Sequence, residues 1–241
     1  MIYNTMKRQL TEDLLWLCPY YIDDLQRIGR DHDGGYIVPK IMIDRADSVL
    51  SLGLGDDWSF ETAWNKLKPK DLIHIYDGDP QGGDWTAELA EQFRSFIQTP
   101  MTYFPRHVTA VNFNQSLNIL GLDIFLKMDI EGGEYDILKN IVNNHTRIIG
   151  ITMEIHDVSG QREKFVQAMK HLQTEYTLVH MHGNTYAGDT LNGVPMLLTD
   201  AMEFTMVRKE FCTSKELRKQ VFIPGLDQGN CPNFEDIEYY Y

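Results

Sequence analysis

The sequence predicts an α/β fold with one mostly parallel sheet and helices on both of its faces. Short apolar runs alternate along the chain with segments in which apolar residues recur at helical spacing, which is typical of a doubly wound sheet. The chain has 241 residues, of which 43% are hydrophobic, and this is enough for one domain with a sizeable core. Because no repeat, low-complexity segment or linker divides the sequence, we expect a single domain over residues 1–241.

Apolar runs predict the strands, and periodic apolar residues between them predict the helices. In chain order the expected strands are Val49–Leu54, Leu72–Tyr76, Met101–Phe104, Ile124–Met128, Ile148–Ile155, Tyr176–Met181 and Glu203–Val207. The residues with helical spacing are Phe60, Ala63, Trp64 and Leu67, then Ile137, Leu138, Ile141 and Val142, then Phe165, Met169 and Leu172. Ser59 is expected to cap the first of these helices, because its hydroxyl can accept a bond from a free backbone N–H.

The two ends of the chain are expected to flank this core of residues 48–208. We interpret residues 1–47 as an N-terminal helical cap with a turn around Asp33-Gly34-Gly35. Residues 209–241 are interpreted as an irregular C-terminal extension, since proline and glycine recur after Phe222. The acidic and aromatic end, EDIEYYY, is expected to be a solvated or docking tail and not part of the site.

Net charge, hydropathy and cysteine content argue against several classes of protein. The formal charge of −13 disfavours a nucleic-acid surface, which needs clustered lysine and arginine. The sequence contains no apolar run that could span a bilayer, and its first residues lack the apolar core of a secretory signal. Three scattered cysteines, Cys18, Cys212 and Cys231, argue for a reducing compartment and against disulfides or a cysteine zinc site. We therefore expect a cytoplasmic protein without nucleic-acid or membrane partners, and the sequence is compatible with a homo-oligomer.

A glycine turn, in the segment VLSLGLGDDWSFE, ends the first expected strand. Gly53 and Gly55 allow a tight turn and the close approach of a ligand. A dinucleotide-binding turn has a third glycine and holds a pyrophosphate at the helix N-terminus, whereas here Trp58 takes the third position, and Asp56 and Asp57 would repel that anion. An acidic turn suits S-adenosylmethionine, which carries a sulfonium cation and no phosphate. A tight turn that binds nothing is the other interpretation of this segment.

Acidic or histidine residues follow the other strands too, at the sheet edge where doubly wound proteins bind ligands. Asp77 lies about 22 residues after Gly55, where a carboxylate can accept both hydrogens of a ribose diol. Asp79 can share that role or be solvated. The later strand ends carry Asp129 and Glu131, Glu154 and His156, and His180, His182 and Asn184.

The segment KMDIEGGEYDIL, Lys127–Leu138, resembles the hallmark segment of FkbM-type methyltransferases. The segments SLGLGDDWSFE, ITMEIH, HMHGNTY and EFTMVRK also resemble that family, so the likeness runs from about Arg30 to about Arg208. The resemblance implies a Rossmann-like class I methyltransferase fold, a seven-stranded sheet with its last strand antiparallel. It also implies S-adenosylmethionine as cofactor and O-methylation of a hydroxyl on a sugar or other small metabolite. Many relatives have a plainer Asp-hydrophobe-Gly-Ala-Asn turn, and this departure leaves the subfamily and the acceptor open.

On this interpretation the cofactor contacts the glycine turn, the end of the second strand and the Asp-x-Glu-Gly segment. Asp129 is placed nearest the reacting end of the methyl donor, and Glu131 is expected to brace its turn by accepting backbone N–H bonds. The predicted cofactor-binding residues are Gly53, Leu54, Gly55, Asp56, Ser59, Phe60, Glu61, Asp77, Gly78, Asp79, Asp129, Ile130 and Glu131.

A hydroxyl acceptor also has to lose its proton, by a base or with help from a metal. His156 is the predicted base because an imidazole titrates near neutral pH, and Glu154 is expected to orient it or to bind a substrate hydroxyl. At most one of His180 and His182 is expected to face the site. We choose His182, which is nearer the strand end, as a catalytic candidate beside His156 and Asp129. The donor atoms of Asp129, Glu154 and His156, with His182, suit a divalent metal, but no spacing signature supports one and no metal is predicted.

Two functions of other classes stay open. An NAD-dependent oxidoreductase would bind its cofactor at the same turn, and the missing third glycine counts against it. A non-catalytic module would bind the cofactor without turning over an acceptor.

Overall fold

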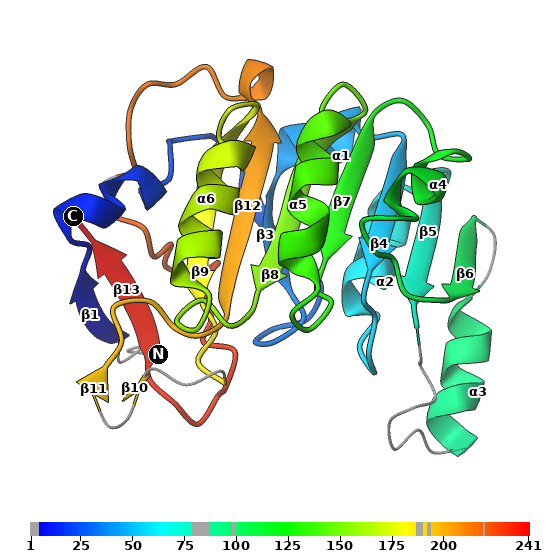
Figure 1. The fold of residues 1–241 in the computed structure, drawn as a ribbon. Helices are drawn as coiled ribbons and strands as arrows, with labels where there is room; N and C mark the ends of the chain where they lie inside the picture. The colour runs from blue at the N-terminus through cyan, green and yellow to red at the C-terminus, as the bar shows by residue number, and fades with distance from the viewer. Residues whose placement is uncertain (1–4, 79–86, 98–99, 187–189, 192–193, 219) are drawn as a thin grey trace.

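A seven-stranded sheet forms the centre of the fold in the computed structural model, which describes residues 5–78, 87–97, 100–186, 190–191, 194–218 and 220–241 (Figure 1). Its strands, in spatial order, are β6 (Met101–Pro105), β5 (Leu72–Asp77), β4 (Ser48–Leu52), β7 (Ile124–Met128), β8 (Ile148–Ile155), β12 (Met202–Arg208) and β9 (Tyr176–Gly183). All seven expected strands are present, and those over Ile124–Met128 and Ile148–Ile155 have the predicted bounds.

The direction of the strands confirms the predicted fold class. Neighbours from β6 to β8 run parallel, whereas β12 runs antiparallel to both β8 and β9. The strand order reverses between β4 and β7, because the chain moves outward through β5 and β6 and then returns to the other side of β4. A crevice forms outside the carboxyl ends of the strands at such a switch point, and this positions the candidate site.

Helices cover both faces of the sheet, as predicted. α4 (Phe113–Leu117), α5 (Glu134–Asn143) and α6 (Arg162–Leu172) lie on one face, and α1 (Lys40–Arg45) and α2 (Ser59–Leu67) lie on the other (Figure 1). α3 (Ala87–Phe96) lies beside the edge strand β6, and a short 3-10 helix, η2 (Lys209–Phe211), follows β12. Within the described part of the chain, no helix is both long and apolar enough to cross a membrane.

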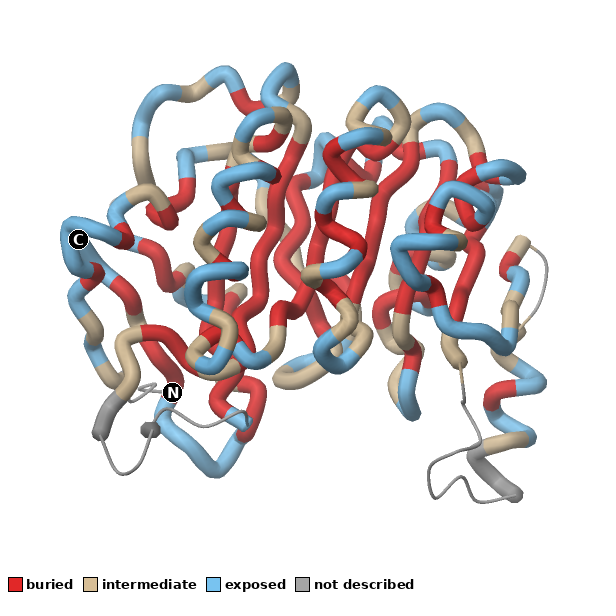
Figure 2. The backbone as a smooth tube through the Cα atoms, viewed as in Figure 1, coloured by how far each residue is buried: buried red, intermediate tan, exposed pale blue. Residues whose placement is uncertain are grey.

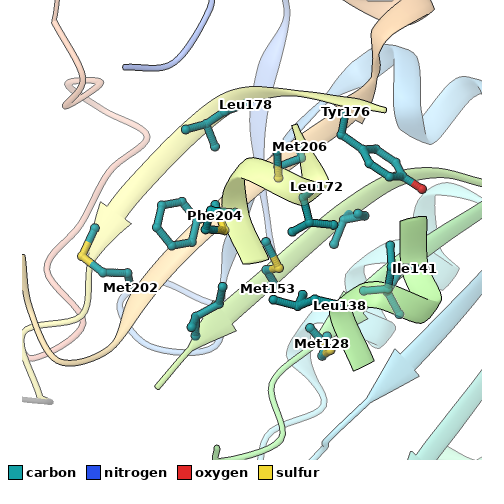
Figure 3. Packing of buried hydrophobic residues seen from close by; sticks show 14 of the residues in the cluster. Met128, Leu138, Ile141, Met153, Leu172, Tyr176, Leu178, Met202, Phe204 and Met206 are labelled. Carbon is teal, nitrogen blue, oxygen red and sulfur yellow. The ribbon is translucent and has the colours of Figure 1, made fainter. Parts of the chain in front are cut away.

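The central strands are buried on both faces, whereas the helices expose their outer sides (Figure 2). This explains why the strands read as continuous apolar runs in the sequence. Leu138 and Ile141 of α5 pack near Met128 and Met153 of the sheet (Figure 3). On the opposite face the fully buried Trp64 of α2 stacks on Phe125 of β7, with 4.9 Å between the ring centroids.

The start of the chain differs from the predicted helical cap. Besides a 3-10 helix, η1 (Glu12–Leu17), and the short α1, it contains β1 (Thr5–Gln9) and a hairpin of β2 (Leu25–Ile28) and β3 (Tyr36–Pro39). The predicted turn at residues 33–34 joins the two strands of that hairpin. The hairpin is tied to the main sheet, because Thr205 Oγ1 donates a hydrogen bond of 2.7 Å to the carbonyl oxygen of Ile37.

Of the two alternatives for the end of the chain, solvated or docking, the structure shows a docked strand. β13 (Asp236–Tyr240) pairs in parallel with β1, and its Ile237 and Tyr239 are buried. A further two-stranded sheet is made by β10 (Thr190–Leu191) and β11 (Val194–Pro195). Residues 209–241 therefore close over the core instead of extending from it.

Candidate functional site

A cavity of about 480 Å³ lies at the carboxyl ends of β4, β5 and β7. This volume is in the range of small-molecule sites, and the position is where a doubly wound sheet binds its ligand. The lining includes most of the predicted cofactor-binding residues, namely Gly53, Leu54, Gly55, Asp56, Phe60, Asp77, Gly78, Asp129, Ile130 and Glu131. Ser59 and Glu61 do not line this cavity, and Asp79 lies outside the described residues.

The glycine turn is held by the end of the neighbouring strand. Gly53 has φ +80°, and a Cβ there would lie 1.5 Å from the carbonyl oxygen of Asp129. The backbone N–H groups of Leu54 and Gly55 donate to Asp77 Oδ2 over 2.8 and 2.9 Å. Asp77 therefore fixes the turn in addition to lining the cavity, and its contact with a ribose stays a proposal.

Ser59 and Glu61 support this turn from outside the cavity. Helix α2 begins at Ser59 itself with Trp58 as its N-cap, so the predicted cap is displaced by one residue. Glu61 is fully buried and accepts a bond from Ser51 Oγ. Burial raises the pKa of Glu61, and the charge of Lys127 opposes that rise. Lys127 Nζ donates to the carbonyl oxygen of Gly53 over 2.6 Å, so Lys127 holds the end of β4 at the turn.

The acidity of the turn is smaller than the sequence indicates. Asp57 Oδ2 lies 3.1 Å from Arg30 Nε, and Asp57 Oδ1 accepts a bond from the N–H of Ser59. Since Arg30 balances the charge of Asp57, the argument against a pyrophosphate rests on Asp56 and on the absent third glycine.

Asp129, at the end of β7, accepts a hydrogen bond of 3.1 Å from the hydroxyl of Tyr36. Tyr36 is buried on β3 and also lines the cavity. Burial, followed by the charges of Asp129, Glu154 and Glu203, raises the pKa of Tyr36 well above its ordinary value. Its hydroxyl therefore stays protonated and acts as a donor that holds the carboxylate of Asp129 in place.

The turn after β7 is braced by Glu134 and not by Glu131. Glu134 Oε1 accepts bonds from the N–H groups of Ile130 and Gly132 over 3.3 and 3.1 Å. Glu131 has φ +56° and an 84% exposed side chain. The left-handed backbone turns the side chain of Glu131 toward solvent, and Glu134, the first residue of α5, reaches back to the free N–H groups.

His156 follows β8 and lies among carboxylates. Its Nδ1 is 3.1 Å from Glu134 Oε1, and its Nε2 is 3.4 Å from Glu131 Oε2 and 3.5 Å from Glu154 Oε1. Burial alone would lower the pKa of His156, but the hydrogen bond with Glu134 and the charges of Glu154, Glu134 and Asp129 outweigh burial and raise this pKa to about 9. The imidazole is therefore protonated at neutral pH, and it has to lose this proton before it can act as a base.

Glu154 connects this group to a second set of acids. It is buried and accepts a bond of 2.7 Å from Asn184 Nδ2. Burial, followed by the charges of Asp129 and Glu203, raises the pKa of Glu154 well above its ordinary value. The fold thus brings Asp129, Glu154 and His156 together, as their places at adjacent strand ends predict.

His182 is not part of the cavity, and its predicted catalytic role is contradicted by its position. Residues two apart in a strand share a face, so His180 and His182 point the same way, contrary to the expectation for the pair. His180 Nε2 lies 2.7 Å from Asp227 Oδ1, and His182 Nε2 lies 2.8 Å from Asp236 Oδ1. All four residues are buried, and they attach the end of the chain to β9.

Several residues that line the cavity were not predicted as site residues from the sequence. Lys127 could have been predicted, because a charged residue inside an apolar strand indicates a buried contact or a functional role. Asp33 lies in the recognised turn, but nothing local places that turn beside β7. Arg30 and Gly34, which precede β3, and His107, Val108 and Thr109, which follow β6, also line the cavity.

Comparisons with known proteins give one match at the level of a family. A family model described as "Methyltransferase FkbM domain" matches residues 37–187, and no curated protein matches the chain. Similar solved structures include a fibrillarin/Nop5p complex, at 13% identity over 68% of this chain and 73% of that chain, with a TM-score of 0.45. Another is the fibrillarin pre-rRNA processing protein of Methanococcus jannaschii, at 10% identity over 83% and 87%, with a TM-score of 0.43. An rRNA methylase from Streptococcus thermophilus is 9% identical over 70% and 92%, with a TM-score of 0.44.

Identities of this size say nothing about the ligands of this chain. The family match, in contrast, spans more than half of the sequence and includes the glycine turn, the segment after β7 and the strands β8 and β9. The chain belongs to the FkbM methyltransferase domain family.

Proposed function

We propose that this protein is an S-adenosylmethionine-dependent methyltransferase that methylates a hydroxyl on a sugar or another small metabolite. The observation that carries the proposal is the cavity between β4, β5 and β7, where the glycine turn, Asp77 and Asp129 meet. A binding site at this switch point, in a member of a methyltransferase family, is best explained by a methyl donor. The hydroxyl acceptor is inferred from the family resemblance.

The residues that line the cavity fit such a cofactor. Asp56, Asp77, Asp129 and Glu131 line it together with Arg30 and Lys127, and the carboxylates suit a sulfonium cation. A Cβ on Gly55 would meet no atom within 4 Å, so the turn leaves open space beside its backbone. In this proposal Asp77 holds the ribose, and Asp129 lies nearest the reacting methyl group.

When bound, S-adenosylmethionine supplies an electrophilic methyl group on a good leaving group, so positioning provides much of the catalysis. Tyr36 fixes Asp129 on one side of the cavity, and Glu134 fixes both the turn after β7 and the ring of His156. In this proposal Glu154, which is buried and does not line the cavity, orients His156 or binds an acceptor hydroxyl. His156 is the proposed base, and a cationic ligand beside it would favour loss of its proton, since like charges repel.

The proposal also covers the cellular location of the protein, the class of its acceptor and its oligomeric state. Cys18, Cys212 and Cys231 are free and buried, which supports a cytoplasmic location. The net charge of −13 supports a small-molecule acceptor over a nucleic acid. A homo-oligomer is compatible with these features.

The substitution Asp129→Asn tests the cofactor site. It keeps an acceptor for Tyr36 but removes the charge, and hydrogen bonds to charged groups contribute about 1.5–3 kcal/mol. We expect affinity for S-adenosylhomocysteine or the rate of methyl transfer to fall roughly 10- to 150-fold, as measured by calorimetry and by transfer assays on a sugar panel. Asp136→Asn, on the exposed side of α5, is the matched control. An Asp129→Asn protein with unchanged affinity and turnover would remove Asp129 from the site.

A further inference from the structure

Three side chains beside the cavity form a mixed group of oxygen and nitrogen donors. Asp129 follows β7, Glu154 lies in β8 and His156 follows β8. One donor atom from each residue lies within 4.8 Å of the other two. Two carboxylates and one imidazole are a ligand set that suits divalent cations in proteins.

The orientation of the His156 ring is an independent observation. A histidine that binds a metal almost always directs its other ring nitrogen to a carboxylate or carbonyl group. Here Nδ1 pairs with Oε1 of the fully buried Glu134, and the hydroxyl of Tyr135 donates to the carbonyl oxygen of His156 over 3.0 Å. Nε2 is thereby directed toward oxygens of Glu154 and Glu131. The ring is held as a ligand requires, with its second nitrogen facing carboxylates.

The balance of charge around Glu154 also favours a cation. Glu154 is only 5% exposed and lies near the carboxylates of Asp129 and Glu203. Among the described residues, no lysine or arginine forms an ion pair with Asp129 or Glu154. A divalent ion would add positive charge beside the partly buried Asp129 and the buried Glu154, and its binding would displace the proton of His156.

A second group of acids shares Glu154 but is already occupied by protein donors. Asp33, Glu154 and Glu203 also have donor atoms within 4.8 Å of one another. Asn230 Nδ2 donates to both Glu203 and Asp33, over 2.6 and 3.3 Å, and His182 Nδ1 lies 3.5 Å from Glu203. The first group also receives protein hydrogen bonds, from Tyr36 to Asp129 and from Asn184 to Glu154. Of the two groups it alone offers an imidazole nitrogen, and it therefore fits an ion better than the second.

We propose that Asp129, Glu154 and His156 bind one divalent cation of the Mg²⁺ and Mn²⁺ class beside the cavity. The cation site itself does not depend on the proposed function, whereas its role in catalysis does. An acceptor hydroxyl on the cation would have a lowered pKa and lose its proton to water. Its oxygen would then form the bond to the methyl carbon as the bond from that carbon to sulfur breaks. With the cation bound, His156 would act as a ligand, and water would replace it in the role of base given in the proposed function.

Binding of Mn²⁺ to the purified protein tests this site. The free Mn²⁺ signal in electron paramagnetic resonance is titrated in about 0.15 M salt, which screens the negative surface. We expect one Mn²⁺ per wild-type chain and at least a tenfold loss of affinity in Glu154→Gln and in His156→Ala. Glu134→Gln, which removes the charge behind the histidine, is expected to weaken binding roughly 10- to 100-fold. Glu175→Gln is the matched control, because Glu175 lies 3.7 Å from His145 in a partly exposed pair at another place.

Thermal unfolding in the same buffer shows whether each variant is folded. Mn²⁺ should raise the midpoint of the wild-type protein and of Glu175→Gln, and leave that of folded Glu154→Gln unchanged. The proposal is overturned if the wild-type chain does not bind Mn²⁺, or if folded Glu154→Gln binds it with wild-type affinity. Titration with S-adenosylhomocysteine separates the two proposals, because Mn²⁺ binding without cofactor binding would contradict the methyltransferase function and leave the cation site standing.

Discussion

Replacing Gly53 with alanine is expected to destabilise the protein by about 3 kcal/mol or more and to abolish binding of S-adenosylhomocysteine. The new Cβ would lie 1.5 Å from the carbonyl oxygen of Asp129, and the backbone there has φ +80°. Relief of this clash requires β4 and β7 to separate at the end where Asp129 N–H donates to the carbonyl oxygen of Leu52 over 2.8 Å. Denaturant unfolding and calorimetry measure the two effects.

Gly55→Ala is the matched control for this experiment. Gly55 also has positive φ, at +59°, but a Cβ there would meet no atom within 4 Å. The substitution should therefore carry only the backbone cost of about 1–2 kcal/mol. If both variants lost the same free energy of unfolding, the close contact between the two strand ends would not be the reason for a glycine at position 53.

Replacing Asp236 with asparagine is expected to destabilise the protein by about 3–5 kcal/mol near pH 6, because it removes the charge of the nearer of the two carboxylates that pair with the buried, protonated His182. Burial alone would lower the pKa of His182, but hydrogen bonds to Asp236 and Glu203 raise it well above its ordinary value. Asp44→Asn, in an exposed pair with Lys40, should change the free energy of unfolding by less than about 0.5 kcal/mol.

The sign of the pKa shift sets how this effect depends on pH. A raised pKa in the folded protein means that the His182 contribution is fully present below the unfolded value of about 6.5. That contribution is lost as pH rises through the folded pKa. The difference between the wild-type protein and Asp236→Asn should therefore shrink steadily above about pH 6.5 in denaturant unfolding. A difference that stays constant with pH would mean that His182 is uncharged in the folded protein.

The main sheet was predictable because its strands are buried on both faces and appear as continuous apolar runs. Ile124–Met128 and Ile148–Ile155 have the predicted bounds for this reason. The pairing of β1 with β13 was not predictable in this way, because the two strands contain both polar and apolar residues and come from opposite ends of the chain. The end of the chain is not a solvated tail because Ile237 and Tyr239 are buried in the main hydrophobic core, among residues that lie far from them in the sequence.

The grouping of the site residues was predictable from their places at strand ends, whereas their individual contacts were not. Asp77 and Asp129 line one cavity, and Asp129 lies near Glu154 and His156, because the parallel strands end at one edge of the sheet. Glu134 braces the turn after β7 in place of Glu131 because the backbone at Glu131 is left-handed. The sequence does not show this conformation. His182 was misplaced because its partner Asp236 is about 54 residues away in the chain.

Calorimetric titration of the wild-type protein with S-adenosylhomocysteine, beside a fluorescence titration with NADH, tests the central claim most directly. We expect one binding site for S-adenosylhomocysteine per chain, weakened by Asp77→Ala, and no binding of NADH. Asp77→Ala removes both the brace of the glycine turn and the proposed contact with the ribose. No binding of S-adenosylhomocysteine to the folded protein, or binding of NADH in its place, would contradict the assignment of this cavity to a methyl donor.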